Sequence, residues 1–262
     1  MSDKAFLGTL FFRIGAHGAD SLLEVEEQIK CNCAEDGNAE RILQGELSAV
    51  AAHLVRCQGS GGAMVAAHNR ITQTLHDAAK AAGLDAEAEP KRWLDGKLIF
   101  GADEDGEPNK RPDLLIHLRE GEAVLVDVTI TSGVNKMVLR NSIKNPEAPL
   151  EHRFKAKTRQ YAKSASTKDH MSAIVPFVVS AHGRLHTGGA RLLDKIARRG
   201  FGTNLSAAGR WKSKWYARLV EATLTGTAWQ LRGEYDRLKA RVLKQRARAT
   251  RADGVVAALC AL

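Results

Sequence analysis

Residues 111–132, RPDLLIHLREGEAVLVDVTITS, constrain the fold most, because two apolar runs here flank a short charged turn. Runs of this length and composition predict two strands, and a turn at 119–122 predicts that they pair as a hairpin. Each run carries one aspartate, Asp113 or Asp127, where a buried strand ordinarily holds an aliphatic residue. The two carboxylates therefore need a physical reason for their positions.

The second run has one polar and one apolar face, because side chains alternate along a strand. Val126 and Val128 are predicted to face the core, whereas Asp127 and Thr129 are predicted to border a cleft. Pairing of the hairpin then lets Asp113 converge on the same point.

Two neighbouring carboxylates repel each other and resist joint ionisation unless a cation lies between them. Oxygen-rich sites of this kind suit Mg²⁺ or Mn²⁺, which bind phosphate oxygens. Such an ion can lower the pKa of a bound water and stabilise charge on a phosphate. The alternative is an edge hairpin whose two aspartates face water.

Pro112-Asp113, thirteen intervening residues and Asp127 resemble the core motif of the PD-(D/E)xK nucleases. The closer resemblance is to its variant in the restriction-like endonucleases of site-specific non-LTR retrotransposons. The resemblance implies that Asp113, Asp127 and the backbone carbonyl of Val128 bind a catalytic Mg²⁺ or Mn²⁺. Thr129 stands where the parent motif has its lysine, which favours the alternative of a DNA-binding protein that kept the fold and lost activity.

In the retrotransposon branch the lysine comes from the following helix, four residues before a tyrosine. Lys157 and Tyr161 have that spacing, which places them on one helical face. The implied role of Lys157 is to orient or deprotonate the attacking water and to offset charge in the transition state. Lys155 and Lys136 are alternatives for the lysine. Tyr161 is interpreted either as a residue at the phosphate or as a ring packed between helix and sheet.

The predicted order of elements from 63 to 199 is α-β-β-β-α-β-α, an α/β fold with a mixed central sheet flanked by helices. Gly83 is predicted to cap the first helix. The resemblance makes this a restriction-endonuclease-like core and covers roughly residues 31–232. We expect three parts: an N-terminal segment at 1–62, the nuclease core at 63–200 and a basic helical C-terminal extension at 201–262.

Three thiols and an imidazole in the N-terminal segment could form a tetrahedral structural Zn²⁺ site: Cys31, Cys33, His53 and Cys57. The other interpretation is a cluster of buried reduced cysteines. The retrotransposon proteins have a similar Cys/His knuckle, followed by a helix that begins RHN; here AAHNRITQTL takes that place. His68 is then an alternative zinc ligand or a helix cap. Residues 39–56 are predicted to be helical.

The formal charge of +9 predicts a polyanionic partner, with double-stranded DNA ahead of a membrane. Residues 236–251 are strongly basic and indicate an electrostatic arm, although a solvated helix face is the other interpretation. The segment 209–218 places Trp211 and Trp215 on one helical face, either stacking on bases or packing in the core. Four basic residues around them are predicted to contact the DNA backbone: Arg210, Lys212, Lys214 and Arg218. His182 and His186 are interpreted as exposed polar residues.

The sequence predicts a site-specific, metal-dependent DNA endonuclease of mobile-element origin. It is interpreted either as a fragment of a larger element protein or as a freestanding endonuclease, and the opening methionine favours the second interpretation. An RNA-processing nuclease is a weaker alternative. A homodimer or two sequential nicks would account for cutting of both strands. No apolar run reaches the roughly 18 residues of a membrane span, and four cysteines in this length favour a reducing, intracellular compartment, the nucleus in a eukaryote.

Overall fold

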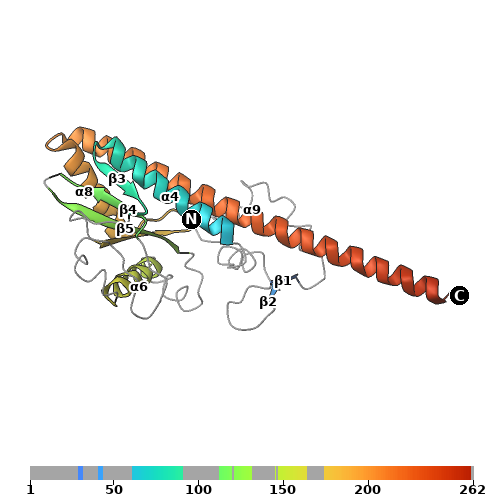
Figure 1. The fold of residues 1–262 in the computed structure, drawn as a ribbon. Helices are drawn as coiled ribbons and strands as arrows, with labels where there is room; N and C mark the ends of the chain where they lie inside the picture. The colour runs from blue at the N-terminus through green and yellow to red at the C-terminus, as the bar shows by residue number, and fades with distance from the viewer. Residues whose placement is uncertain are drawn as a thin grey trace. The chain divides into compact units, whose positions relative to one another are not determined.

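The computed structural model (Figure 1) describes residues 29–31, 41–43, 61–90, 112–119, 121–131, 145, 147–163 and 174–260. The chain divides into two compact units, one of 65–227 and one of 1–64 with 228–262. The described elements, in chain order, are β1 Ile29–Cys31, β2 Arg41–Leu43, α4 Gly61–Ala81, β3 Asp85–Ala88, β4 Leu114–His117, β5 Ala123–Thr131, α6 Ala148–Lys163, β6 Ile174–Ser180, α8 Thr187–Phe201 and α9 Leu205–Cys260.

The unit of 65–227 is built on a four-stranded mixed sheet in the order β3-β4-β5-β6. β4 pairs antiparallel with β3 and β5, whereas β5 pairs parallel with β6 through the crossover that contains α6. The hairpin turn is closed by a hydrogen bond from Leu118 N to Glu122 O. The predicted α/β class and the predicted order of elements between 63 and 199 are confirmed.

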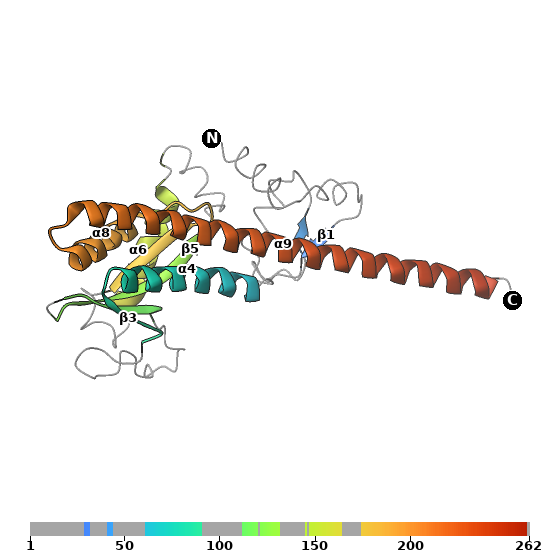
Figure 2. The same ribbon diagram turned by 90° about the horizontal axis from the view of Figure 1, so that it is seen from above.

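One face of the sheet carries the main core, which lies under α4, α8 and the first part of α9 (Figures 1 and 2). The β5 residues on this face are Val124, Val126 and Val128, all buried, as the alternation of the strand predicts. α6 lies over the opposite face, where Leu115 and Leu125 form a smaller cluster.

α4 follows the predicted helical pattern and ends at the predicted cap. Ile71 and Leu75 are fully buried, and Gly83 takes the left-handed conformation with φ +74° that favours glycine. Leu84 N donates to Ala79 O, which satisfies one of the last helical carbonyls. Val65, which has the spacing of the core residues, is exposed instead.

The first part of α9 belongs to the same core. Trp211 and Trp215 are both buried, so the core-packing interpretation of the two tryptophans is confirmed. A Cβ on Gly226 would lie only 2.7 Å from the Cβ of Ala67, which shows that α9 and α4 approach closely at this point. The compact unit therefore runs to 227, further along the chain than the expected boundary at 200.

In the other unit, β1 and β2 pair antiparallel, with Cys31 opposite Arg41. The helix predicted for 39–56 is wrong at Arg41–Leu43, because pairing with β1 is a tertiary interaction that local helix preference does not reflect. The rest of that prediction lies outside the described residues, as do Cys33, His53, Cys57 and Lys136. None of the helices described is long and apolar enough to span a membrane.

Candidate active site

Asp113 lies where the chain begins β4, held by both neighbouring strands. Its backbone N–H donates to Val126 O at 2.8 Å, and its carbonyl accepts from Glu89 N at 2.9 Å. Its side chain turns toward β5, where Oδ2 accepts from Val128 N at 2.6 Å. The Asp113 carboxylate thus bonds to the residue that follows Asp127, and 20% of its side chain remains exposed.

Regular pairing between β4 and β5 ends before Val128. Leu114 is the partner of Val126, and the backbone N–H of Asp113 donates to the carbonyl of that same Val126, so the two strands slip by one residue at Asp113. Side chains complete the end of the ladder instead, with Asp113 at the Val128 N–H and His68 at the Val128 carbonyl.

His68 comes from α4 and reaches both groups. Its Nε2 lies 3.2 Å from Asp113 Oδ2 and 3.2 Å from Val128 O, while its Nδ1 lies 3.2 Å from Asn69 Oδ1. Burial lowers the pKa of His68, but the hydrogen bond and negative charge of Asp113 outweigh burial, so that its pKa is raised. Because His68 lies inside α4, the helix-cap interpretation is wrong.

Asp127 lies within β5 and is only 5% exposed. Its Oδ1 accepts from Tyr161 Oη at 2.6 Å, and Lys157 Nζ lies 3.1 Å from each of its oxygens. Thr129 Oγ1 donates to Oδ2 at 3.3 Å. The polar face of β5, which was expected to border a cleft, is instead covered by α6 at Asp127 and Thr129, both of them buried.

Of the two interpretations of Tyr161, packing between helix and sheet is the one that its surroundings support. Its ring is 1% exposed, which confirms packing between helix and sheet, and its hydroxyl donates to Asp127. Burial raises the pKa of Tyr161 far above its ordinary value, and the negative charges of Asp127 and Asp113 raise it further. The phenol therefore stays protonated and serves as a fixed hydrogen-bond donor. A role at the phosphate stays a prediction.

The i, i+4 spacing of Lys157 and Tyr161 brings both side chains to Asp127 from one face of α6. Lys155 instead pairs with Glu151 at 3.1 Å, and 59% of its side chain is exposed. Of the two lysines in α6 that the sequence offered for this role, Lys157 is thus the one that pairs with the second aspartate.

A divalent metal ion needs several oxygen or nitrogen donors that lie close together. Among the residues described, no three His, Cys, Asp or Glu side chains gather into a metal-binding group. Asp113 Oδ2 and Val128 O do lie together beside His68 Nε2, and carboxylate and carbonyl oxygens suit Mg²⁺ and Mn²⁺. A carboxylate has about four lone-pair sites, and Tyr161, Lys157 and Thr129 already contact the two oxygens of Asp127. To bind the same ion, Asp127 would therefore have to give up one of these contacts, of which the one with Thr129 is the longest.

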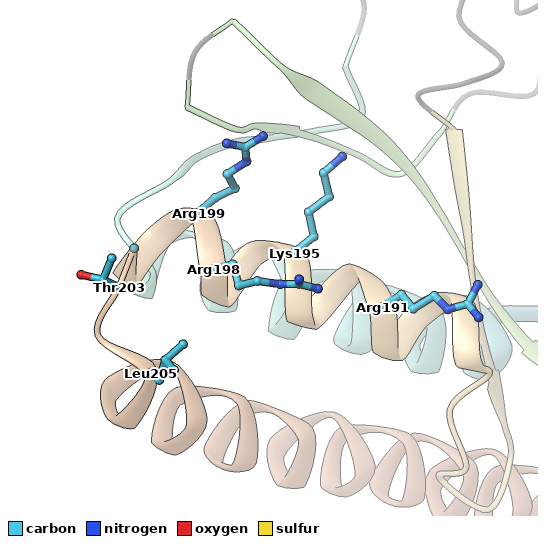
Figure 3. Close-up of a pocket in the computed structure, with 7 residues that line it drawn as sticks. Arg191, Lys195, Arg198, Arg199, Thr203 and Leu205 are labelled. Atoms are coloured by element: carbon cyan, nitrogen blue, oxygen red, sulfur yellow. The ribbon is translucent and has the colours of Figure 1, made fainter.

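A basic groove of about 830 Å³ lies along α8 and the turn into α9 (Figure 3). It is lined by Arg191, Lys195, Arg198 and Arg199, with Gly202, Thr203 and Leu205. Lys195 and Arg199 contact Glu122 of the β4–β5 turn. Sequence reasoning missed this groove, although basic residues recurring three and four apart on a predicted helix were its signal.

The four basic residues predicted from the start of α9 are all exposed. Two contact polar groups: Arg210 donates to Ser206 Oγ, and Lys212 pairs with Asp194 of α8 at 2.8 Å. The other two, Lys214 and Arg218, lie over the ring of Trp215. The Lys212–Asp194 pair shows that this stretch of α9 runs beside α8, whose residues line the groove.

The interpretation of His186 as an exposed polar residue is wrong. His186 is 4% exposed and caps α8, where its Nδ1 accepts from Gly188 N at 3.0 Å. Its Nε2 donates to Glu151 at 2.7 Å, and its ring stacks on Phe154. The sequence signal that was missed is an N-cap position directly before a predicted helix. His182 is half-buried.

No protein-family model matches this chain, and no curated protein sequence matches it. The resemblance to restriction-like endonucleases accordingly stays an expectation. The function of the protein is inferred from the residues that meet at β4, β5, α4 and α6.

Proposed function

We propose that this protein is a divalent-metal-dependent DNA endonuclease that hydrolyses phosphodiester bonds. The single observation that carries the proposal is that Asp113 bonds to the backbone N–H of Val128, the residue next to Asp127, while Lys157 pairs with Asp127 from the other face of the sheet. A lysine–aspartate pair that is mostly buried is costly unless it is well hydrogen-bonded, so its presence next to a second carboxylate favours a chemical role.

Asp113 and Asp127, with the Val128 carbonyl, would hold Mg²⁺ or Mn²⁺. The bound ion would neutralise developing charge on the phosphate and make a water more acidic. Lys157, which Asp127 holds in place, would present its ammonium group to the attacking water or to a phosphate oxygen. Tyr161 would keep Asp127 in position by its short hydrogen bond.

The proposed substrate is double-stranded DNA. The formal charge of +9 favours a polyanion. The groove along α8 and the exposed basic residues of α9 would contact phosphates without reading bases. Binding of this kind weakens steeply as salt rises. The clustered basic residues of α8 and α9 therefore indicate where the duplex would lie. A homodimer would bring a second active site to the other strand.

The direct test is cleavage of supercoiled plasmid by the full chain with Mg²⁺, with Mn²⁺ and with EDTA. We expect nicked or linear DNA with either ion, none with EDTA, and none with Asp113→Ala or Asp127→Asn. Asp77→Ala, which changes an exposed carboxylate on α4, is the matched control and should cut normally. Cutting that survives both substitutions of the site would overturn the assignment.

A second candidate is a DNA-binding protein without catalytic activity. The observation that favours it is the set of donors around Asp127, where Lys157, Tyr161 and Thr129 already bond to both oxygens. DNA binding without cutting in any metal would favour this candidate. Stronger competition by RNA than by duplex DNA would favour an RNA-processing nuclease.

Structural Zn²⁺ is proposed for the N-terminal segment. Its four ligands would be Cys31, Cys33, His53 and Cys57, of which the structure describes Cys31, at the end of β1. Elemental analysis of the purified chain should find about one zinc per chain, and Cys31→Ser with Cys33→Ser should remove it.

A further inference from the structure

We propose that His68 is a further protein ligand of the catalytic metal and that its imidazole shifts the preference of the site from Mg²⁺ toward Mn²⁺. The inference rests on the proposed function, because it takes Asp113 and Val128 as metal ligands. His68 lies 45 residues from Asp113 in the chain, and the metal-binding motif assigns it no role.

The spacing of the three donor atoms is compatible with coordination of one ion as well as with hydrogen bonding. Adjacent ligands of an octahedral ion, with bonds of about 2.1–2.2 Å at right angles, are roughly 3.0–3.1 Å apart. His68 Nε2 lies 3.2 Å from both Asp113 Oδ2 and Val128 O. In a hydrogen-bonded arrangement the single Nε2–H would be shared between two acceptors, with 3.2 Å at the long end of the range for each.

The three donor atoms are held by separate parts of the fold. Asp113 Oδ2 is fixed by Val128 N at 2.6 Å, and Val128 is a buried residue of β5. The turn of α4 that carries His68 is pressed against α9, because Ala67 touches Gly226 too closely for any side chain there. His68 therefore approaches the site from a packed helix.

Imidazole nitrogen is a softer ligand than carboxylate or carbonyl oxygen. Mg²⁺ prefers oxygen ligands and gives up its waters reluctantly, whereas first-row transition ions bind mixed nitrogen and oxygen sites more readily. His68 would therefore add more affinity for Mn²⁺ than for Mg²⁺. The half-exposed ring has 31% of its side-chain surface open, which leaves room for an ion to reach Nε2.

The test is titration of the full chain with MnCl₂ or MgCl₂ alone, without DNA, by calorimetry, with pulsed electron paramagnetic resonance of bound Mn²⁺. In the wild type we expect nitrogen coupling to Mn²⁺ from a coordinated imidazole. His68→Ala should remove that coupling and weaken Mn²⁺ binding about tenfold or more, with a much smaller change for Mg²⁺. His68→Gln keeps a polar side chain and should restore part of the affinity without the imidazole signal.

His76→Ala is the matched control, since His76 lies on the same helix near Gln73 and Asp77. It should leave the coupling and the affinity unchanged. Unchanged or tighter Mn²⁺ binding in His68→Ala, or wild-type Mn²⁺ without nitrogen coupling, would overturn the role of His68 and leave the proposed function standing. Absence of Mn²⁺ and Mg²⁺ binding in the wild type, or undiminished binding in Asp113→Ala, would instead count against the proposed metal site itself.

Discussion

The surroundings of Asp127 and Asp113 differ sharply, although the two aspartates belong to paired strands. The side chain of Asp127 is 7% exposed and lies under α6, where a lysine, a tyrosine and a threonine donate to it. The side chain of Asp113 is 20% exposed and lies at the end of a ladder, bonded to one backbone N–H and close to one histidine. We call the buried surroundings of Asp127 the closed region and the partly exposed surroundings of Asp113 the open region.

The difference separates two uses of a carboxylate. A buried carboxylate keeps its charge only when donors surround it, and those donors then hold it in one position. A carboxylate at an open strand end costs less to ionise and keeps lone pairs for a ligand. Asp127 thus positions Lys157 and would have to give up one of its donors to bind an ion, whereas Asp113 keeps lone pairs for an ion.

The largest expected effect is on the closed region. Asp127→Ala would leave the Lys157 ammonium and the Tyr161 hydroxyl with no carboxylate between helix and sheet. We expect the free energy of unfolding to fall by about 3–5 kcal/mol, measured by urea denaturation. Asp127→Asn keeps one acceptor oxygen and should cost less. If Asp127→Ala lowered the free energy of unfolding by no more than a surface substitution does, the Lys157–Asp127 pair would not contribute to stability.

The next effect compares two lysines of the same helix. Lys157→Met removes the charged donor but leaves Asp127 with Tyr161 and Thr129, so we expect a loss of about 1–3 kcal/mol. Lys155 is exposed at 59% of its side chain, and Lys155→Met should change stability by less than about 0.5 kcal/mol. Equal losses in the two variants would contradict the difference in their environments.

A smaller effect is expected in the open region. Asp113→Ala removes the acceptor of the Val128 N–H near the surface, which should cost about 1 kcal/mol of stability. The same variant should lose most of its Mn²⁺ affinity by calorimetry. Substitution of Asp127 would then cost more stability, and substitution of Asp113 would cost more Mn²⁺ affinity. This opposite order requires that Asp127→Asn still binds Mn²⁺ measurably. A larger loss of stability in Asp113→Ala than in Asp127→Ala would reverse the comparison.

The smallest effect concerns Glu151, a third carboxylate, at the surface of α6. A hydrogen bond from His186, and then one from Lys155, hold the pKa of Glu151 below its ordinary value of 4.5. This stabilisation is fully present above pH 4.5 and is lost as the pH falls through the lower folded value. Below pH 4.5 the Tm of the wild type should therefore fall more steeply than that of Glu151→Gln. Glu221→Gln, an exposed substitution on α9, should follow the wild type.

The sequence predicted the elements of the site well. The strand AVLVDVTIT is β5, residue for residue, and the i, i+4 pair Lys157 and Tyr161 lies on one face of α6. These predictions succeeded because strand alternation and helical periodicity are local properties of the chain. The same local rules left open whether Trp211 and Trp215 face nucleic acid or core.

By itself, the sequence determined the order of strands and helices between 63 and 199, and it placed Asp127, Lys157 and Tyr161 on these elements and Asp113 at the start of one of them. Only the tertiary structure decided that α6 buries Asp127, that α8 and α9 line a basic groove, and that His68 reaches Asp113. The physical reason is sequence separation. Asp127 meets Lys157 across 30 residues, and His68 meets Val128 across 60, so the contacts depend on how helices pack on the two faces of one sheet.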